Sequence, residues 1–227
     1  IAALESKAGH AILARSINEA IKNKPFLDLQ TRRLNPLNTD FAEMVLEIDK
    51  PFRLNDLVCQ EIVESKVRRV IREYLHRDKL AEYHLGNRRK LLLSGPSGTG
   101  KTMTASILAN ELHLPLYVVL IEKVVTKFMG ESSLKLGKVF DLIYQNQGVY
   151  FFDEFDAIGA DRNLDNEVGE ARRILNSFLQ FLEQDNSDSI IIAATNNQKL
   201  LDQALFRRFD DVLHYSLPSE AEIKCIF

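Results

Sequence analysis

A glycine-rich loop is the sequence feature that most restricts how this chain can fold. The loop lies between an apolar segment at 90–94 and an amphipathic segment at 102–112, and it reads Gly95-Pro96-Ser97-Gly98-Thr99-Gly100-Lys101-Thr102. It fits the pattern G-x-x-x-x-G-K-[ST], whose glycines let backbone N–H groups turn inward around phosphates. In that pattern Lys101 reaches the outer phosphates, Thr102 binds Mg²⁺, and the next helix points its positive N-terminus at the anion. All eight residues are therefore predicted to bind a nucleotide between a strand and a helix.

Short apolar segments alternate with helical ones from Asn87 onward. Helices are predicted at Thr102–Leu112 and Gly169–Gln184, and strands at Lys90–Ser94, Leu116–Leu120, Val149–Asp153, Ser189–Thr195 and Val212–Leu217. Near-continuously apolar strands separated by helices indicate a buried, mostly parallel sheet that is covered on both faces. We therefore predict an α/β fold with a five-stranded, mostly parallel sheet flanked by helices.

The N-terminal part of the chain has a different pattern. Residues 1–22 are predicted to form an amphipathic helix, and the irregular stretch that follows contains one short strand candidate, Met44–Ile48. A second helix is predicted from a cap at Asn55 or Asp56 to about His84, with Gly86 as its C-cap. We assign residues 1–50 to an N-terminal helical region with a linker, and residues 51–227 to the core domain.

Composition excludes several classes of protein. The 227 residues are 45% hydrophobic and 27% charged, with a formal net charge of −3, which excludes a disordered chain and argues against a protein that mainly coats nucleic acid. A run of basic residues near 66–77 is interleaved with acidic ones, which is typical of a solvated helix face. The two cysteines lack metal-binding spacing, and no apolar run reaches the length of a membrane span. A cytoplasmic protein is the resulting expectation.

An acidic pair follows the predicted strand at 149–152. Four apolar residues bury that strand, and Asp153 and Glu154 then emerge at its carboxyl end, which is the edge where open α/β sheets bind ligands. Asp153 is expected to hold Mg²⁺ through the water shell of the ion, and Glu154 to polarise an attacking water molecule. The alternative is a pair of solvated acids in a loop.

The order of these motifs resembles the AAA+ ATPase superfamily and, within it, the AAA group of protein-remodelling rings. The resemblance covers about residues 88–217, and the chain looks like stand-alone bacterial AAA ATPases. Phe155–Gly159 follows the acidic pair as in the family, and Ala193–Asn197 looks like the family's sensor-1 strand. The resemblance implies that Asn196 positions water near the γ-phosphate of ATP.

The segment 201–210 resembles the second region of homology, which supplies arginine fingers in this family. The resemblance implies that Arg207 and Arg208 complete the site of a neighbouring subunit, and hence that the chain assembles into a ring, most simply a hexamer. Relatives often have Pro-Gly between the two arginines, whereas here they are adjacent, so the residue that reaches the phosphate is left open. Alternatively, both arginines pair with Asp210, Asp211 and nearby acids.

Lys127, Phe128 and Met129 resemble the pore loop that faces the central channel in remodelling rings. An aromatic side chain on such a loop grips an extended peptide without reading its sequence, so a protein client is implied. Alternatively, Phe128 and Met129 are core residues at a junction between a helix and a loop. The polar tract Gly159–Gly169 looks like the second pore loop.

The resemblance implies a module that binds ATP or ADP with Mg²⁺, hydrolyses ATP and remodels a protein client that the sequence does not identify. Two rival functions stay open: a nucleotide-gated switch or scaffold that threads nothing, and a DNA-acting AAA+ machine, although no added DNA-binding element is found in the sequence. In the family a small helical lid follows the core, and this chain stops at Phe227 before one could form. We therefore expect the 227 residues to be part of a longer ATPase.

Overall fold

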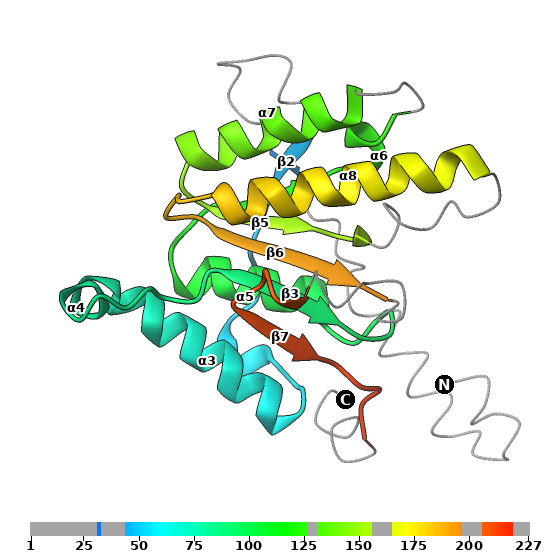
Figure 1. Cartoon of the computed structure of the whole chain (residues 1–227). Helices are drawn as coiled ribbons and strands as arrows, with labels where there is room; N and C mark the ends of the chain where they lie inside the picture. Colours follow the sequence, from blue (N-terminus) through cyan, green and yellow to red (C-terminus); the bar gives the residue numbers. More distant parts are fainter. Residues whose placement is uncertain (1–30, 33–43, 127–130, 156–164, 197–205, 220–227) are drawn as a thin grey trace, which may run out of the picture. The chain divides into compact units, whose positions relative to one another are not determined.

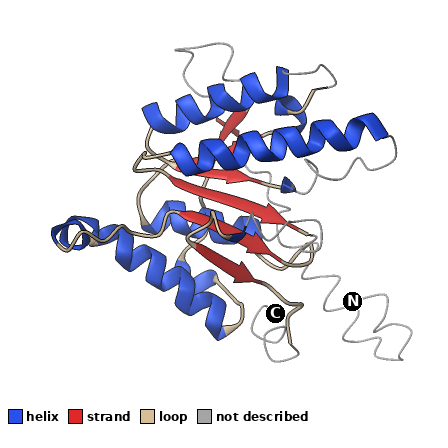
Figure 2. Ribbon diagram, in the orientation of Figure 1, coloured by secondary structure: helices blue, strands red, loops and turns tan. Residues whose placement is uncertain are grey.

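Seven strands form one sheet in the part of the chain that is described, in the order β1-β2-β4-β5-β6-β3-β7 (Figures 1 and 2). The structure is a computed structural model that describes residues 31–32, 44–126, 131–155, 165–196 and 206–219. The strands are β1 (Thr31–Arg32), β2 (Val45–Ile48), β3 (Lys90–Ser94), β4 (Leu116–Val119), β5 (Val149–Phe152), β6 (Ile190–Thr195) and β7 (Asp211–His214). The helices are η1 (Leu54–Asp56), α3 (Glu61–Leu75), α4 (Arg77–Glu82), α5 (Lys101–Glu111), α6 (Ile121–Val124), α7 (Glu131–Gln145) and α8 (Asp165–Gln184).

The five strands expected to be parallel are parallel. β4, β5, β6, β3 and β7 pair in parallel with one another, and β3 has the predicted bounds Lys90–Ser94. Two further strands extend the sheet beyond β4. β2 pairs antiparallel with β4, and β1 pairs antiparallel with β2. β2 is the strand expected at Met44–Ile48. The predicted α/β fold with a mostly parallel sheet is therefore confirmed and extended by two edge strands.

Helices cover both faces of the sheet, with α7 and α8 on one face and α3 and α5 on the other (Figure 1). Because β5 lies between the two layers, all four of its residues are fully buried. On the first face Phe152 packs edge-on against Phe178 of α8, with ring centroids 5.2 Å apart. Phe140 of α7 stacks on Phe152 and meets Phe178 edge-on. Aromatic side chains of this size remove large apolar areas from water and prefer such tilted contacts. This cluster fixes α7 and α8 on the sheet.

The single helix predicted from Asn55 or Asp56 to His84 is wrong. The chain instead forms η1, α3 and α4, because α3 begins only at Glu61 and the backbone leaves the helical region at His76. α4 ends in a motif in which His84, at φ 57°, donates to Ala81 O and Leu85 donates to Leu80 O. His84 therefore occupies the left-handed position of the cap, and the prediction of Gly86 there was also wrong.

Helix α8 begins at Asp165, four residues before the predicted start at Gly169. Residues 165–169 of the proposed second pore loop are thus helical, whereas 159–164 lie outside the described residues. The predicted helix at 1–22 and the proposed pore-loop residues Lys127, Phe128 and Met129 also lie outside them. In the described ranges, no helix combines the length and apolar character that crossing a bilayer requires.

Candidate functional site

The carboxyl ends of β3, β5 and β6 lie side by side, which brings three of the predicted motifs to one edge of the sheet. β6 pairs in parallel with β5 on one side and with β3 on the other. The glycine-rich loop follows β3, Asp153 follows β5, and Asn196 follows β6. Because ligands of open α/β sheets bind outside the carboxyl ends of the strands, this edge is the candidate site.

The glycine-rich loop curls so that its backbone leads directly into α5. Gly98 and Gly100 have φ values of 77° and 97°, which other residues adopt only at a cost, and Gly100 is the N-cap of the helix. The Thr99 hydroxyl donates to Pro96 O at 2.8 Å and closes the turn. The first N–H groups of an α-helix have no carbonyl partner within the helix, so the start of α5 beside this loop is suited to an anion.

Gly95 is packed against the chain that continues β7. Its N–H donates to Thr195 O at 3.1 Å, while the N–H of Tyr215 donates to Ser94 O at 2.7 Å. A Cβ atom on Gly95 would lie only 2.4 Å from Tyr215 O, so glycine is required here by close approach. The Tyr215 hydroxyl also lies 2.7 Å from Thr104 Oγ1 in α5. Tyr215 thus supports the loop although it belongs to no motif, and its only signal in the sequence is its position just beyond a strand at this edge.

Lys101 and Asn196, which lie far apart in the sequence, meet in this site. Lys101 is 7% exposed, and its ammonium donates to Gly95 O and Pro96 O, each at 2.8 Å, and to Asn196 Oδ1 at 2.7 Å. An ammonium has three donors, and these acceptors match that number. The structure thus places the predicted phosphate-binding lysine and the predicted sensor residue in direct contact.

Thr102 and the acidic pair form the other half of the site. The Thr102 hydroxyl lies 3.3 Å from Asp153 Oδ2, so a hydroxyl and a carboxylate oxygen converge as hard ligands of the kind that Mg²⁺ takes. Glu154 is exposed and has a φ of 48°, and its N–H donates to Asp153 Oδ1 at 2.9 Å. Phe155 beside it is 1% exposed and packs against Phe178. A left-handed non-glycine residue held between two anchored neighbours is the kind of strain that collects at functional sites.

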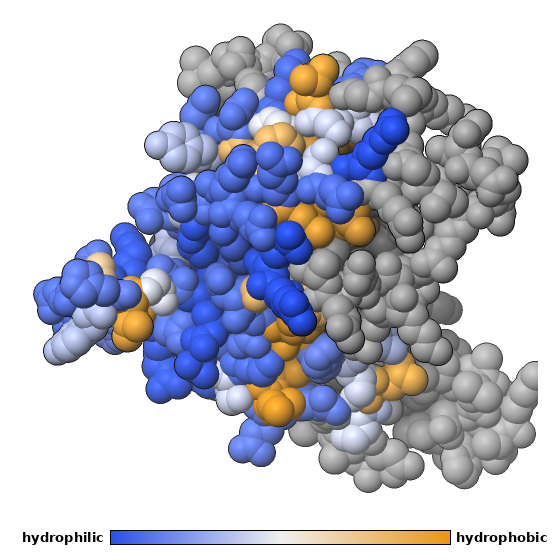
Figure 3. All heavy atoms as spheres, in the orientation of Figure 1, coloured by the Kyte–Doolittle hydropathy of each residue, from blue (hydrophilic) through white to orange (hydrophobic). Residues whose placement is uncertain are grey.

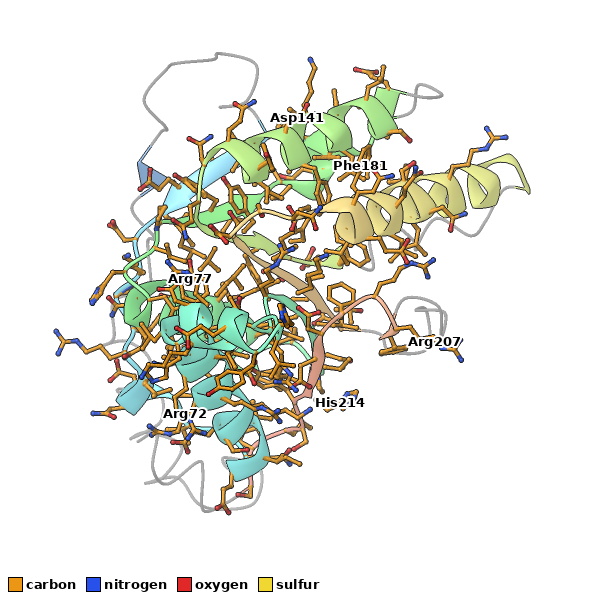
Figure 4. The ribbon with its side chains drawn as sticks, turned by 60° about the vertical axis from the view of Figure 1, so that its left-hand side comes forward. Arg72, Arg77, Asp141, Phe181, Arg207 and His214 are labelled. Atoms are coloured by element: carbon orange, nitrogen blue, oxygen red, sulfur yellow. The ribbon has the colours of Figure 1, made fainter. Side chains whose placement is uncertain are left out.

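The two adjacent arginines have different surroundings. Arg208 Nε pairs with Glu183 Oε1 of α8 at 2.7 Å. Arg207 is exposed and has no ion-pair partner among the described residues, and in Figure 4 its side chain points away from the packed elements. The alternative is met in part, because the pair between Arg208 and Glu183 is a contact with a nearby acid. Among the described residues, no ion pair joins either arginine to Asp210 or Asp211. Instead, Asp210 accepts hydrogen bonds from the N–H groups of residues 89 and 90, and Asp211 pairs with Lys66 and Arg88.

The basic run on α3 is a solvated face, as its composition predicted. Arg68 pairs with Glu64 and Arg69 with Glu73, both four residues apart on the helix. Figure 3 shows that hydrophilic side chains dominate this part of the visible surface. The acidic partners offset much of the positive charge that a nucleic acid would need.

The chain is similar to known proteins over most of its length. Residues 91–217 match the sequence profile of the ATPase family associated with various cellular activities (AAA). An uncharacterised AAA family ATPase of Sinorhizobium fredii, y4kL, is 33% identical over 223 residues, which cover 96% of this chain and 68% of that protein.

Two further relatives are named for proteasome-related roles. A putative 26S proteasome regulatory subunit homologue of Methanothermobacter marburgensis is 31% identical over 179 residues, or 78% of this chain and 47% of that protein. A proteasome-activating nucleotidase of Thermococcus onnurineus is 38% identical over 137 residues, or 57% of this chain and 34% of that protein. The chain thus spans about half or less of the length of these two relatives. With the profile match, they show that the chain belongs to the AAA family of ATPases, within the AAA+ superfamily.

Proposed function

We propose that this chain is an Mg²⁺-dependent ATPase module whose site is shared between neighbouring subunits of a ring. The observation that carries the proposal is the meeting of Lys101 with Asn196 and of Thr102 with Asp153 at one sheet edge. Phosphate binding, ion binding and water positioning require groups of these types close together. We propose ATP and ADP as the nucleotides, bound by residues 95–102.

The residues have distinct roles in the proposed reaction. Phosphate oxygens would take the place of the carbonyls of Gly95 and Pro96 as acceptors for Lys101, because a charged acceptor binds an ammonium more strongly than a neutral one. Thr102 and Asp153 would hold Mg²⁺, which when bound neutralises charge on phosphate oxygens. Glu154 and the amide of Asn196 would orient the attacking water in line with the γ-phosphate.

One of the two adjacent arginines, Arg207 or Arg208, is proposed to act across a subunit boundary. An arginine finger stabilises charge that develops on the transferred phosphoryl group and contributes about 10³- to 10⁵-fold in rate. The exposed position of Arg207 is suited to insertion into a neighbour. Family membership supports assembly into a ring, and a hexamer is the proposed number of subunits.

Remodelling of a protein client is the proposed output. Lys127, Phe128 and Met129 lie between β4 and β5 in the chain, where the family has its pore loop. The printed names of the proteasome-related relatives fit the same output. Phe128→Ala is the discriminating variant, because it should abolish remodelling of a client and leave ATP hydrolysis intact. Unchanged remodelling would instead favour the nucleotide-gated switch.

The ATPase itself is tested with Lys101→Ala and Glu154→Gln, with Lys138→Ala as the matched control. Lys138 is an exposed lysine on α7, so its loss should change neither binding nor turnover. Because the chain contains no Trp, a fluorescent ATP analogue is the practical binding probe. Lys101→Ala should lose detectable binding, while Glu154→Gln should bind normally and turn over at least about 10²-fold more slowly. Normal nucleotide affinity in Lys101→Ala would refute the phosphate-binding role.

A further inference from the structure

We propose that Glu183 is a positioning residue for the shared site: it holds Arg208 on its own chain, so that Arg207 projects as the arginine finger. The inference rests on the proposed function and deepens it, because it separates the roles of two adjacent arginines. Its starting point is the ion pair between Arg208 Nε and Glu183 Oε1 at 2.7 Å. Arg207, one residue earlier, is exposed and unpaired among the described residues.

The short segment that carries the arginines is anchored on both sides. Phe209 is 7% exposed in the core, and Phe206 packs against the same core cluster. Asp210 Oδ2 accepts the N–H groups of Arg89 and Lys90, each at 2.8 Å, and Asp210 N–H donates to Lys90 O. The backbone between the two phenylalanines therefore has little freedom, and of the two arginines it is Arg208 that pairs with Glu183.

The end of α8, where Glu183 lies, is fixed to the same place. The Asp185 side chain is 2% exposed and pairs with Arg89, whose Nη2 also donates to Asp185 O at 2.6 Å. Lys90 Nζ donates to Asp185 O at 3.2 Å. Arg89 and Lys90, at the start of β3, thus hold both the arginine segment and the helix end. Glu183 and Arg208 are brought together by two anchored elements rather than by the chance approach of two long side chains.

The exposure of the two side chains limits how much the ion pair between Glu183 and Arg208 adds to folding stability. The Glu183 and Arg208 side chains are 54% and 31% exposed, and pairs this exposed add little to folding stability. The pair instead pins the peptide unit between Arg207 and Arg208 and keeps the Arg208 guanidinium from the neighbour's site. Positioning errors of about 1 Å far from the reacting atoms can cost about 10²-fold in rate. Loss of the pair should therefore lower turnover without changing stability or nucleotide binding.

A double-mutant cycle on the oligomer tests the proposal. We expect Glu183→Gln and Arg208→Gln each to lower the maximal rate of ATP hydrolysis about tenfold, with unchanged affinity for the fluorescent ATP analogue and unchanged Tm. The double variant should be no slower than either single variant, since the two residues act as one unit. Arg207→Ala should abolish turnover in every background. Glu64→Gln, which breaks a comparably exposed pair with Arg68 on α3, is the control and should leave turnover unchanged.

Two sets of results separate failure of the inference from failure of the proposed function. Full turnover in Glu183→Gln, additive losses in the double variant, or a fall in Tm together with weakened nucleotide binding would each overturn the positioning role of Glu183. A mixture of the Arg207→Ala and Glu154→Gln variants whose turnover never exceeds the sum of the two would overturn the shared site itself, whatever Glu183→Gln does. Full turnover in Arg207→Ala would overturn the assignment of Arg207 as the finger.

Discussion

The hydroxyl of Tyr215 lies 2.7 Å from Thr104 Oγ1 and so joins the end of β7 to the first turn of α5. The Thr104 hydroxyl has a single proton, which it donates to Gly100 O at 3.1 Å, so it must accept the proton of Tyr215. The segment that begins with the arginines and continues through β7 therefore ends as a support of the phosphate loop. This one short stretch of chain therefore carries the two arginines and also supports the phosphate loop.

Tyr215→Phe removes this hydrogen bond and keeps the ring. Because Thr104 still donates to Gly100 O, we expect the free energy of unfolding to fall by only about 1 kcal/mol. If all of this loss is passed to the site, the Kd for nucleotide rises at most about fivefold. Urea denaturation and titration with the fluorescent analogue measure the two effects. Tyr144→Phe, at a tyrosine that is 73% exposed, is the control.

Gly95→Ala should be far more damaging than its small size suggests. The added methyl group would meet Tyr215 O at 2.4 Å and Tyr215 Cβ at 2.7 Å, and the backbone must shift to relieve the contact. Such overpacking costs about 1–3 kcal/mol or more, and here it also displaces an acceptor of Lys101. Gly86→Ala is the matched control, because nothing lies within 4 Å of the added atom. Equal Tm values for the two variants would contradict the close approach at Gly95.

Much of the sheet could be predicted because buried parallel strands have continuously apolar sequences. β3 and β6 therefore have nearly the expected bounds. The break at His76 could not be predicted, because the apolar stripe of α3 continues toward it with no Gly or Pro to end the helix. The local sequence pattern therefore predicts that a helix or strand is present, whereas tertiary packing determines the residue at which it ends.

In the candidate site, too, some residues could be predicted from the sequence, whereas certain of their contacts could not. Lys101 and Thr102 were predicted from the glycine-rich motif, and Asp153 from its place after an apolar strand. Asn196 was predicted from the resemblance to the family. The partners of Arg208 and Thr104 could not be predicted. They depend on β3 lying between β6 and β7, and sequence patterns do not contain strand order.

Stability should fall steeply above pH 10. Burial raises the pKa of Tyr150 and Tyr215, and to a lesser degree of Tyr74 and Tyr117, so the folded state keeps protons that the unfolded chain releases near pH 10. Their stabilisation is full below that pH and is lost as the pH rises. The loss is up to about 1.4 kcal/mol per pH unit for each of Tyr150 and Tyr215.

Two partly buried lysines oppose this loss of stability only below about pH 10.4, where unfolded lysines lose their protons. Burial lowers the pKa of Lys50 and Lys90, so their contribution to stability rises with pH until the unfolded lysines lose their protons near 10.4. Tm measured between pH 9 and 12, together with tyrosinate absorbance, checks the balance. Tyr150→Phe should flatten the alkaline loss, whereas ionisation of every tyrosine near pH 10 in the folded protein would contradict it.

Mixing two inactive variants should restore activity if the site is shared between subunits. Arg207→Ala leaves a subunit's own Lys101, Asp153 and Glu154 intact, and Glu154→Gln leaves its own Arg207 intact. At a mixed boundary, the Arg207→Ala subunit would hydrolyse ATP with the arginine of its Glu154→Gln neighbour. In an equal mixture with random assembly, about a quarter of the boundaries have this composition, so turnover should recover to about a quarter of the wild-type rate. Either variant alone should be far slower, because each lacks a group that contributes at least about 10²-fold to the rate. Turnover of the mixture should be followed against the fraction of each variant at fixed total protein. A rate that never exceeds the sum of the two variants would show that each subunit completes its own site.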